Sequence, residues 1–450
     1  MRIARALTIA GSDSGGGAGI QADLKTFAAL GVHGMSAVTA LTAQNTVEVT
    51  MVHDVPVEMV REQIRVVVRD IGVDAVKTGM LHTSEIIEAV AEELRGMSAP
   101  LVVDPVMVAK SGASLLREDA RRSLVEVLLP LATVVTPNAR EAEVLSGLSV
   151  RDVESQKQAA RKIAELGPKA VVVKGGHVAG DKVADVLYWE GEFKVYESER
   201  LESRNTHGTG CTFASAIAAE LAKKTPIPKA VEIAKGFVMD AIRYGLPLGG
   251  GHGPVNPTGR IFLDADRFQA LRHLRQAVEI LENLEGLSRL IPESQSNLVM
   301  ALEAAESVED VAAIPGRIVR LDDRVKASSC PWFGASRHVA KAVLTAMKFN
   351  PRIRSAMNLR YGRDVLEAAE SLGWRISYYD RRLEPEDVKR AEGRSVPWGV
   401  ETAVKRLGVV PDLIYHEGDW GKEPMTLIFG ETPLEVAEKV KALIKKLRGR

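Results

Sequence analysis

The first part of the chain alternates short apolar runs with stretches of helical periodicity. The apolar runs end at small, polar or charged residues and cover residues 6–10, 73–77, 101–103, 134–136 and 170–173. The helical stretches include residues 20–30, 85–94, 120–129 and 213–222. Because parallel strands need crossover connections, this alternation predicts a parallel sheet with helices on both faces. The carboxyl ends of such strands gather on one edge, where open sheets bind their ligands.

Two glycine-rich stretches each lead into a helical pattern. Residues 11–19 read Gly-Ser-Asp-Ser-Gly-Gly-Gly-Ala-Gly, and residues 205–212 read Asn-Thr-His-Gly-Thr-Gly-Cys-Thr. In the second stretch, backbone N–H groups at a helix N-terminus are free to hold an anion, so we expect a phosphate cradle there. A tight turn without a ligand is the alternative.

Cys211 lies in the first turn of the helix that follows the second glycine-rich stretch. A helix N-terminus stabilises a thiolate and lowers the thiol pKa from about 8.5. Such a thiol could act as a base or contact the substrate. The alternative is a small buried residue that only fills space.

Charged residues follow the later strands. Asp104 and Glu141 offer carboxylate oxygens, the ligands that Mg²⁺ prefers, and Lys174 could meet a phosphate. Each carboxylate could instead serve only as a helix cap. Their expected convergence on one edge of the sheet favours a functional site.

Composition excludes several classes of partner. Lys plus Arg and Asp plus Glu are both 59, so no net charge attracts nucleic acid or an anionic membrane. The two cysteines, Cys211 and Cys330, stand far apart, and the nine histidines lack metal-ligand spacing. The N-terminus lacks a signal-type apolar core, and no apolar run approaches the ~20 residues of a membrane span. We expect a cytoplasmic protein with small-molecule partners.

A set of motifs in residues 3–258 resembles the hydroxymethylpyrimidine/phosphomethylpyrimidine kinases (ThiD type) of thiamine biosynthesis, which belong to the ribokinase-like superfamily. Besides residues 11–23 and 205–212, the motifs are Thr39-Ala-Leu-Thr-Ala-Gln-Asn45, Lys77-Thr-Gly-Met80, Asp104-Pro-Val-Met107, Asn138-x-x-Glu141 and Gly251-His-Gly-Pro-Val-Asn-Pro257. The resemblance implies a ribokinase-like α/β domain with a parallel sheet, ATP and Mg²⁺ as cofactors, and a homodimer. Phosphorylation of a pyridoxine-like vitamer is the alternative activity.

The same resemblance implies roles for individual residues. The aminopyrimidine pocket would be lined by Gly11, Asp23, Gln44, Met80 and Val106, with Gln44 reading the polar edge of the ring. Mg²⁺ would be held by Asn138, Glu141 and Asp104, and the ATP phosphates by Lys174, Thr209 and Gly210. Cys211 stands where most ribokinase relatives carry a catalytic Asp, and it would act with Gly208 and Gly210.

A Gly- and Pro-rich stretch at residues 246–256 precedes a charged helical region, which predicts two domains, 1–260 and 261–450. The second is a separate, smaller α/β domain. Helices are expected at residues 267–284, 296–305, 336–348, 364–372, 401–407 and 434–447. Strands are expected at residues 316–320, 355–361, 376–379, 412–416 and 425–429.

Arginines accompany glycines and a helix start in the second domain. The segments Gly334-Ala-Ser-Arg-His338 and Asn358-x-Arg360-Tyr361-Gly-Arg363 suit a diphosphate, because guanidinium groups match phosphate oxygens in pairs. A solvated arginine surface is the alternative. His338 is as compatible with a packed histidine as with a proton carrier.

Residues 265–448 resemble the ThiN-type thiamine-phosphate synthase domain. The resemblance rests on Gly316-Arg-Ile-Val-Arg320, Phe333-Gly-Ala-Ser-Arg-His338, Ala356-Met-Asn-Leu-Arg360-Tyr361 and Gly418-Asp-Trp-Gly-Lys-Glu-Pro424. It implies condensation of hydroxymethylpyrimidine diphosphate with thiazole phosphate, which releases diphosphate and leaves thiamine phosphate. Arg320 and His338 would be catalytic, and substrate would be bound by Ser336, Arg337, Asn358 and Arg360. A regulatory module that senses thiamine phosphates without turnover is the alternative.

Overall fold

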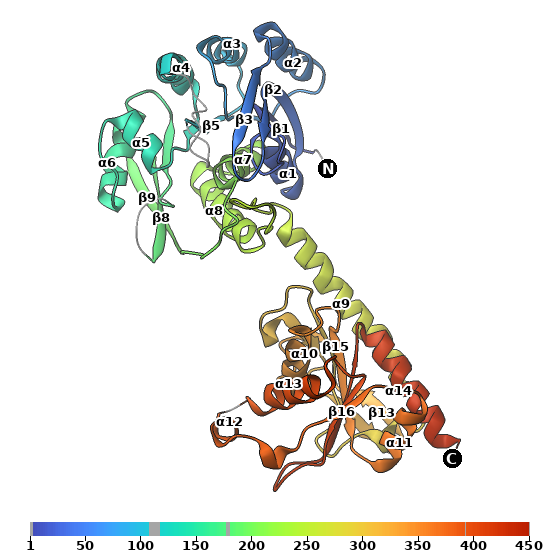
Figure 1. Cartoon of the computed structure of the whole chain (residues 1–450). Helices are drawn as coiled ribbons and strands as arrows, with labels where there is room; N and C mark the ends of the chain where they lie inside the picture. The colour runs from blue at the N-terminus through green and yellow to red at the C-terminus, as the bar shows by residue number, and fades with distance from the viewer. Residues whose placement is uncertain (1–2, 108–117, 177–180, 392, 450) are drawn as a thin grey trace. The chain divides into compact units, whose positions relative to one another are not determined.

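The computed structural model describes residues 3–107, 118–176, 181–391 and 393–449. The chain divides into two compact units, Met1–Ile261 and Phe262–Arg450 (Figure 1). Among the described residues, no helix combines the length and the apolar character that a membrane span needs.

The first unit is built on a nine-stranded sheet of order β3-β2-β1-β4-β5-β6-β7-β8-β9. The strands from β2 to β7 in this order pair in parallel, whereas β3 and the β8–β9 hairpin pair antiparallel at the two edges. Their bounds are β1 Arg5–Asp13, β2 His33–Gln44, β3 Val49–Asp54, β4 Ala75–Thr78, β5 Leu101–Val103, β6 Val134–Val135, β7 Ala170–Val173, β8 Lys182–Trp189 and β9 Glu192–Glu199.

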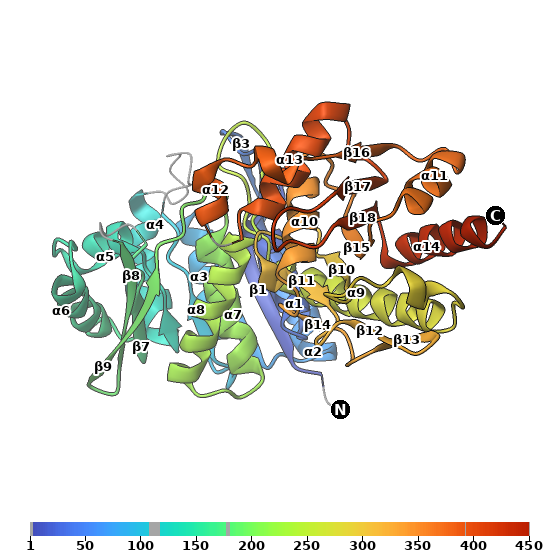
Figure 2. The same ribbon diagram turned by 90° about the horizontal axis from the view of Figure 1, so that it is seen from below.

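Helices cover both faces of this sheet, as the sequence predicts. Alternate residues of a strand face opposite sides, so Leu7 and Ile9 of β1 pack into one core and Ala6 into the other. The first core is covered by α2 Val57–Asp70, α3 Ser84–Leu94, α4 Glu118–Ser123, α5 Ala139–Ser146 and α6 Val153–Ala164. The second is covered by α1 Gly19–Ala29, α7 Thr209–Ala222 and α8 Ile227–Arg243, of which α7 and α8 pack side by side (Figure 2).

The helix expected at residues 120–129 is interrupted. After α4, the chain makes one π-helical turn at Leu124–Leu128 and a 3-10 turn at Leu129–Leu131. Pro130 explains the end of the regular helix, because proline lacks the N–H that the next turn would use and its ring clashes with the preceding turn.

The second unit contains a seven-stranded sheet of order β14-β11-β10-β15-β18-β17-β16 and a separate β12–β13 hairpin. Its pairs are antiparallel except β16 with β17. The strands are β10 Leu298–Ala301, β11 Val311–Ala313, β12 Ile318–Leu321, β13 Arg324–Ala327, β14 Trp332–Phe333, β15 Ser355–Arg360, β16 Ile376–Tyr378, β17 Leu413–His416 and β18 Met425–Gly430.

Two cores flank the sheet of the second unit. One lies under α9 Gly259–Glu282, α11 Arg363–Ser371 and α14 Pro433–Arg448. The other lies under α10 His338–Met347 and α13 Ser395–Leu407. A short helix, α12 Glu386–Arg390, precedes α13.

The helix expected at residues 296–305 is wrong, because residues Leu298–Ala301 form strand β10. All four residues of this strand are buried, since the sheet carries helices on both faces. A continuous apolar run of that length fits a buried helix or a buried strand equally well, so periodicity alone does not separate them.

The two glycine-rich stretches of the first unit touch each other. Gly208 has a φ of 82°, and a Cβ atom there would overlap the carbonyl oxygen of Gly17. A Cβ atom at Gly17 would overlap the imidazole ring of His207. Glycine is therefore required on both sides of this junction, for backbone conformation at Gly208 and for space at both positions.

Gly208→Ala is expected to destabilise the first unit by about 3 kcal/mol, because a strained φ and a backbone overlap act together. The matched control is Gly147→Ala, whose φ is 73° but whose Cβ atom meets nothing within 4 Å. The control should cost about 1 kcal/mol. Urea unfolding of both variants measures the difference, and equal losses would contradict the close packing of the two loops.

Candidate active sites

A cavity of about 490 Å³ opens at the carboxyl edge of the parallel sheet in the first unit. It is bounded by the first glycine-rich stretch, the ends of β2, β4 and β5, the start of α7 and one side of α8. The structure brings most of the predicted kinase residues together in its wall, namely Gly11, Gln44, Met80, Asp104, Val106, Asn138, Glu141, Lys174, Gly208, Thr209, Gly210 and Cys211.

One end of the cavity has an apolar wall with a polar group beside it. Met80 and Val106 belong to a small hydrophobic cluster, and the sulfur of Met80 lies 3.3 Å from the position of a Cβ atom on Gly11. Gln44, at the end of β2, lines the same cavity. A flat heteroaromatic ring with polar edge groups fits such a combination.

Asp23 does not line the cavity, in contrast to the expectation from the sequence. It is fully buried in α1, where its carboxylate accepts hydrogen bonds from Thr8 Oγ1 and Ser215 Oγ at 2.6 Å and from Lys77 Nζ at 2.8 Å. Every oxygen of Asp23 is committed to the protein interior. Asp23 therefore fixes Lys77 rather than a ligand.

Lys77 is a cavity residue that sequence reasoning assigned no role. Burial is the largest single influence and disfavours its ammonium form, but the carboxylates of Asp23 and Asp104 and the hydrogen bond to Asp23 together outweigh it, so the pKa of Lys77 lies above its ordinary value. The side chain is consequently a permanent positive charge beneath the cavity. A lysine inside an otherwise apolar strand, at the end of β4, was the available signal.

The start of α7 presents an anion-binding surface. Gly208 is the N-cap and offers no side chain to the first N–H groups of the helix. The hydroxyl of Thr209 donates to the carbonyl oxygen of Thr206 at 2.7 Å, so it holds the loop closed. The exposed donors are thus backbone N–H groups of the first turn, as an oxyanion requires.

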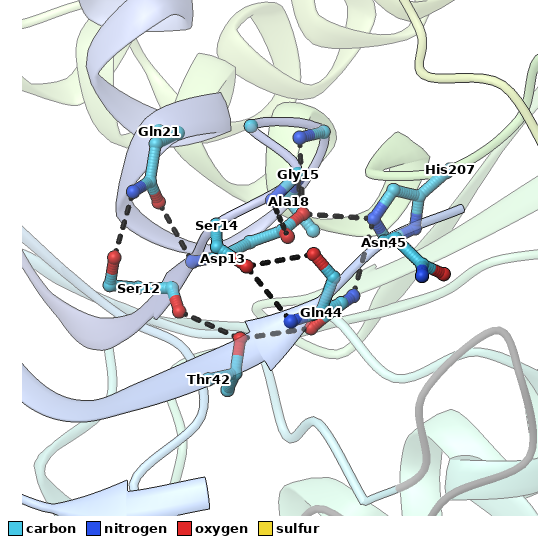
Figure 3. Close-up of polar contacts among 12 residues, drawn as sticks. Ser12, Asp13, Ser14, Gly15, Ala18, Gln21, Thr42, Gln44, Asn45 and His207 are labelled. Carbon is cyan, nitrogen blue, oxygen red and sulfur yellow. Dashed lines mark hydrogen bonds and ion pairs between the residues drawn. The ribbon is translucent and has the colours of Figure 1, made fainter. Parts of the chain in front are cut away.

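The first glycine-rich stretch is different, because its donors are already used. The carboxylate of Asp13 accepts hydrogen bonds from the backbone N–H groups of Gly15, Gly17 and Ala18 at 2.8 to 3.0 Å (Figure 3). An internal carboxylate therefore occupies the position that a phosphate would take in an anion-binding loop.

The expectation of a lowered pKa for Cys211 is wrong. Burial raises its pKa to about 11, and the carboxylates of Asp23 and Asp104 add to the increase. The positive charge of Lys77 and the N–H of Gly19 act in the opposite direction without offsetting burial. Near neutral pH, Cys211 is a neutral thiol.

A charge cluster lies beside the anion-binding turn. Lys174 Nζ lies 3.0 Å from Asp104 Oδ1 and 3.4 Å from the position of a Cβ atom on Gly210. Burial disfavours the ammonium form of Lys174, but Asp104 and Glu141 outweigh it and raise its pKa. Lys174 is therefore placed to neutralise a phosphate bound at the start of α7.

Asn138 and Glu141 form a capping box at the start of α5. Asn138 Oδ1 accepts from the N–H of Glu141 at 3.0 Å, and Glu141 Oε2 accepts from the N–H of Asn138 at 2.8 Å. The two residues therefore cap α5 and also line the cavity, so both roles considered for them in the sequence are present.

Glu141 is buried in the cavity wall near both Lys174 and Asp104. Burial raises the pKa of Glu141 to about 7, since the attraction of Lys174 is partly cancelled by the repulsion of Asp104. No third acidic, histidine or cysteine side chain joins these two carboxylates among the described residues. The donor set fits Mg²⁺, which binds through one or two carboxylates and completes its shell with water and phosphate oxygens.

Part of the remaining wall of the cavity is apolar and comes from elements that the sequence motifs did not mark. Val183 of β8, Val238 and Met239 of α8, and Ile242 line it. Such a surface suits the flat base of a nucleotide. No glycine or charged motif marks these residues, and β8 shows no regular alternation of apolar and polar residues that would have singled them out.

In the second unit, His338 is the first residue of α10 and lies within a cluster of cations. Burial is the main cause that lowers the pKa of His338. Repulsion from Arg317, Lys341, Lys422 and Arg381 lowers it further. These four cations had no role assigned from the sequence, although Arg317 and Lys422 lie within the quoted motifs. Positive charges around a helix N-terminus suit a diphosphate.

Asn358 and Arg320 are connected through Gln295. Asn358 Nδ2 donates to the carbonyl oxygen of Gln295 at 3.0 Å, and its Oδ1 accepts from the N–H of Asn297 at 2.7 Å. The side chain of Gln295 in turn accepts from the N–H of Arg320 at 3.1 Å. Asn358 is therefore a backbone anchor for the loop beside Arg320, rather than a free substrate ligand.

The other predicted residues of this unit occupy different settings. Arg360 forms an ion pair with Asp364 at 2.6 Å and donates to the carbonyl oxygen of Arg289. Ser336 is buried, and Arg337 is the N-cap of α10. Arg360 is thus already paired within the unit.

Glu384 and His416 are further buried polar residues of this unit. Glu384 lies 3.6 Å from Arg381, and its Oε1 atom has no hydrogen-bond partner among the described residues. Burial, followed by repulsion from Arg381, lowers the pKa of His416 to about 4, so this histidine is neutral.

Comparison with known proteins identifies both units. Residues 13–256 match the family model of phosphomethylpyrimidine kinase, which covers more than half of the chain. The chain therefore belongs to the phosphomethylpyrimidine kinase family. Residues 273–442 match the model of thiamine-phosphate synthase ThiN. We call Met1–Ile261 the kinase unit and Phe262–Arg450 the synthase unit.

Relatives of the kinase unit are close. The hydroxymethylpyrimidine/phosphomethylpyrimidine kinase of Streptomyces coelicolor is 55% identical over 250 residues, 56% of this chain and 93% of that protein. The thiamine biosynthesis bifunctional protein ThiED of Geobacter sulfurreducens is 54% identical over 252 residues, 56% of this chain and 51% of that protein.

Solved structures confirm the fold class of the kinase unit. Bacillus subtilis pyridoxal kinase in its ADP complex aligns with a TM-score of 0.55 and 42% identity, over 58% of this chain and 99% of that chain. Staphylococcus aureus pyridoxal kinase with AMP-PCP and pyridoxal aligns with a TM-score of 0.54 and 39% identity, over 58% of this chain and 94% of that chain. The roles of single site residues stay predictions.

Cys211→Ala tests whether the thiol is a base. The thiol loses its proton only as the pH approaches its pKa of about 11, so the pH profile of kcat between pH 6 and 9 should be unchanged in the variant. We expect kcat to fall about tenfold, the loss of a contact of roughly 1.4 kcal/mol. A wild-type kcat that rises with pH, beside a flat profile for the variant, would instead identify a thiolate base.

We predict that Glu141 makes Mg²⁺ binding depend on pH. Because its pKa is about 7 without the cation, Mg²⁺ must displace a proton below that pH but not above it. Affinity should rise about tenfold from pH 6 to pH 8 and then level off. Calorimetry in buffers of different ionisation enthalpy counts the released proton, and Glu141→Gln should abolish its release. Tight binding without proton release in the wild type would contradict the assignment.

Proposed function

We propose that the chain is a bifunctional enzyme of thiamine biosynthesis. The kinase unit phosphorylates 4-amino-5-hydroxymethyl-2-methylpyrimidine to its monophosphate and then to its diphosphate, with ATP as donor. The synthase unit condenses the diphosphate with thiazole phosphate to thiamine phosphate and releases diphosphate. The observation that carries the proposal is one cavity that joins an apolar ring pocket beside Gln44 to an anion-binding helix N-terminus.

In the kinase unit, the substrate hydroxyl attacks the γ-phosphorus of ATP, the new O–P bond forms, and the bond to the β-phosphate oxygen breaks, while the hydroxyl proton passes to an oxygen of the transferred phosphoryl group. This reaction needs positioning and charge neutralisation more than covalent help. Lys174 and the N–H groups at the start of α7 would bind the transferred phosphoryl group, while Asp104 and Glu141 would hold Mg²⁺. When bound, Mg²⁺ supplies positive charge to the phosphate oxygens.

The raised pKa of Cys211 assigns it a positioning role in this step. A neutral thiol beside the N–H groups of α7 contacts the hydroxyl without removing its proton. In a loose transition state the attacking oxygen carries little new charge, so a strong base is not required. The permanent charge of Lys77 beneath the cavity supports the anionic groups above it.

In the synthase unit, the bond between the pyrimidine methylene carbon and the diphosphate oxygen breaks, and the thiazole nitrogen forms the new bond to that carbon. Arg317, Lys341, Arg381 and Lys422 would hold the leaving diphosphate near His338. The lowered pKa leaves His338 neutral near pH 7, so it can accept a hydrogen bond or a proton. Arg320 is the second residue proposed as catalytic, and its backbone N–H donates to the side chain of Gln295.

A second activity has support from one observation. Solved structures that share the kinase fold are pyridoxal kinases at 42% and 39% identity. A ring alcohol of the pyridoxine type would meet the same apolar wall and the same phosphate cradle. The family resemblance also implies that the protein is a homodimer in the cytoplasm, and both statements are part of the proposal.

Product analysis of the intact chain tests the assignment of steps. Wild-type protein with hydroxymethylpyrimidine, Mg-ATP and thiazole phosphate should form thiamine phosphate, detected by mass. Lys174→Ala should reduce diphosphate formation by about a hundredfold, as expected for loss of a charge that stabilises the transferred group. His338→Ala should accumulate the pyrimidine diphosphate.

Two outcomes would overturn parts of this assignment. If the wild type accumulates the pyrimidine diphosphate and forms no thiamine phosphate, the second unit is a sensing module rather than a synthase. If kcat/KM is higher for pyridoxal than for hydroxymethylpyrimidine, pyridoxal rather than the pyrimidine is the main substrate.

A further inference from the structure

His207 lies where three loops of the kinase unit meet. Its backbone N–H donates to the carbonyl oxygen of Gly253, and its own carbonyl accepts from the N–H of Val255, both at 3.0 Å. Its ring nitrogen Nε2 lies 3.0 Å from Asp13 Oδ2. The side chain thereby joins the first glycine-rich stretch, residues 11–19, to the loop that begins α7 (Figure 3).

Asp13 is the partner that makes this connection rigid. It is 3% exposed, and its carboxylate accepts from three backbone N–H groups of its own loop as well as facing the imidazole. Burial raises its pKa, but the hydrogen bond of His207 and those of the backbone outweigh burial and hold the pKa below its usual value. The carboxylate is therefore ionised and fully engaged.

The same junction reaches the ring pocket. Gln44 Nε2 lies 3.4 Å from His207 Nε2. The backbone N–H of Gln44 donates to Ser14 Oγ at 2.8 Å, and its carbonyl accepts from the same hydroxyl at 2.7 Å. Gln44 is thus held through its backbone by the first glycine-rich stretch, and its side chain lies against the ring of His207 without a hydrogen bond, because His207 Nε2 donates to Asp13.

We propose that Asp13 and His207 are a positioning pair, which fixes the distance between the ring pocket at Gln44 and the phosphate cradle at the start of α7. This inference rests on the proposed function, since both ends of the substrate must be held together. In-line transfer depends on the alignment of the hydroxyl oxygen with the γ-phosphorus, and a misplacement of about 1 Å costs up to about a hundredfold in rate. Neither residue needs to touch the reacting atoms for this role.

Kinetics of two substitutions at His207 test the pair. His207→Ala removes the N–H that donates to the carboxylate of Asp13. The loss of this hydrogen bond to a charged group should raise KM for the pyrimidine about tenfold and lower kcat about tenfold. KM for ATP should rise less than KM for the pyrimidine, because ATP also contacts the apolar wall at Val183 and Val238, which is not part of the junction. His207→Gln offers an amide N–H in place of Nε2 and should restore part of both losses.

The matched control is His82→Ala. His82 Nδ1 lies 2.6 Å from Asp54 Oδ1 in the same unit, and His82 is not part of the cavity wall. This substitution should leave both KM values and kcat within about twofold of the wild type. Asp13→Asn combined with His207→Ala should cost little more than either alone, because the two side chains act as a unit. Additive losses, or equal effects on KM for ATP and for the pyrimidine, would overturn the proposal.

Hydrogen–deuterium exchange gives a readout that does not depend on the substrate. In His207→Ala, exchange should accelerate in both residues 11–19 and residues 206–212, whereas His82→Ala should accelerate it in neither. Acceleration confined to residues 206–212 would show that His207 stabilises only its own loop and would refute the pair. If the wild type does not turn over the pyrimidine but the exchange result is as predicted, the proposed substrate is refuted and the positioning pair is still supported.

Discussion

The contact between the two glycine-rich stretches of the kinase unit is the constraint on which its cavity depends. Gly17 and Gly208 approach so closely that neither tolerates a side chain, and the Asp13–His207 contact at 3.0 Å spans the same junction. One stretch follows β1 and the other begins α7, so the junction ties the sheet edge to the helix that covers it. The ring pocket and the phosphate cradle face the same cavity because this junction exists.

The two stretches look alike in sequence but have opposite electrostatic roles. The N–H groups of Gly15, Gly17 and Ala18 are occupied by the carboxylate of Asp13. The start of α7 has no capping side chain and faces Lys174 within the cavity. An external phosphate therefore finds donors and positive charge at the second stretch, while the first is already neutralised by the protein. The synthase unit follows the second pattern, with cations around the first residue of α10.

Much of the fold and of the site follows from local sequence patterns. Buried parallel strands such as Ala170–Val173 stand out as apolar runs between helices, and their ends mark Asp104 and Lys174 as neighbours. The edge strands β3 and β9 and their neighbours β2 and β8 were not predicted, because half-exposed strands carry a weaker apolar signal. Residues Leu298–Ala301 were assigned to a helix because a short apolar run has no distinguishing period.

Properties that depend on distant partners were beyond the sequence. The burial of Asp23 follows from Lys77 and Ser215, which lie far from it along the chain. The raised pKa of Cys211 reflects burial, which the sequence argument from the helix N-terminus did not include. His207 is separated from Asp13 by 194 positions, so no spacing rule connects them.

A crystal structure of the protein with AMP-PCP and hydroxymethylpyrimidine tests the central claim most directly. The account predicts the terminal phosphate at the backbone N–H groups of Gly210 and Cys211, within reach of Lys174, and the ring between Met80 and Gln44. A terminal phosphate bound instead by the N–H groups of Gly15, Gly17 and Ala18, with Asp13 displaced, would contradict it.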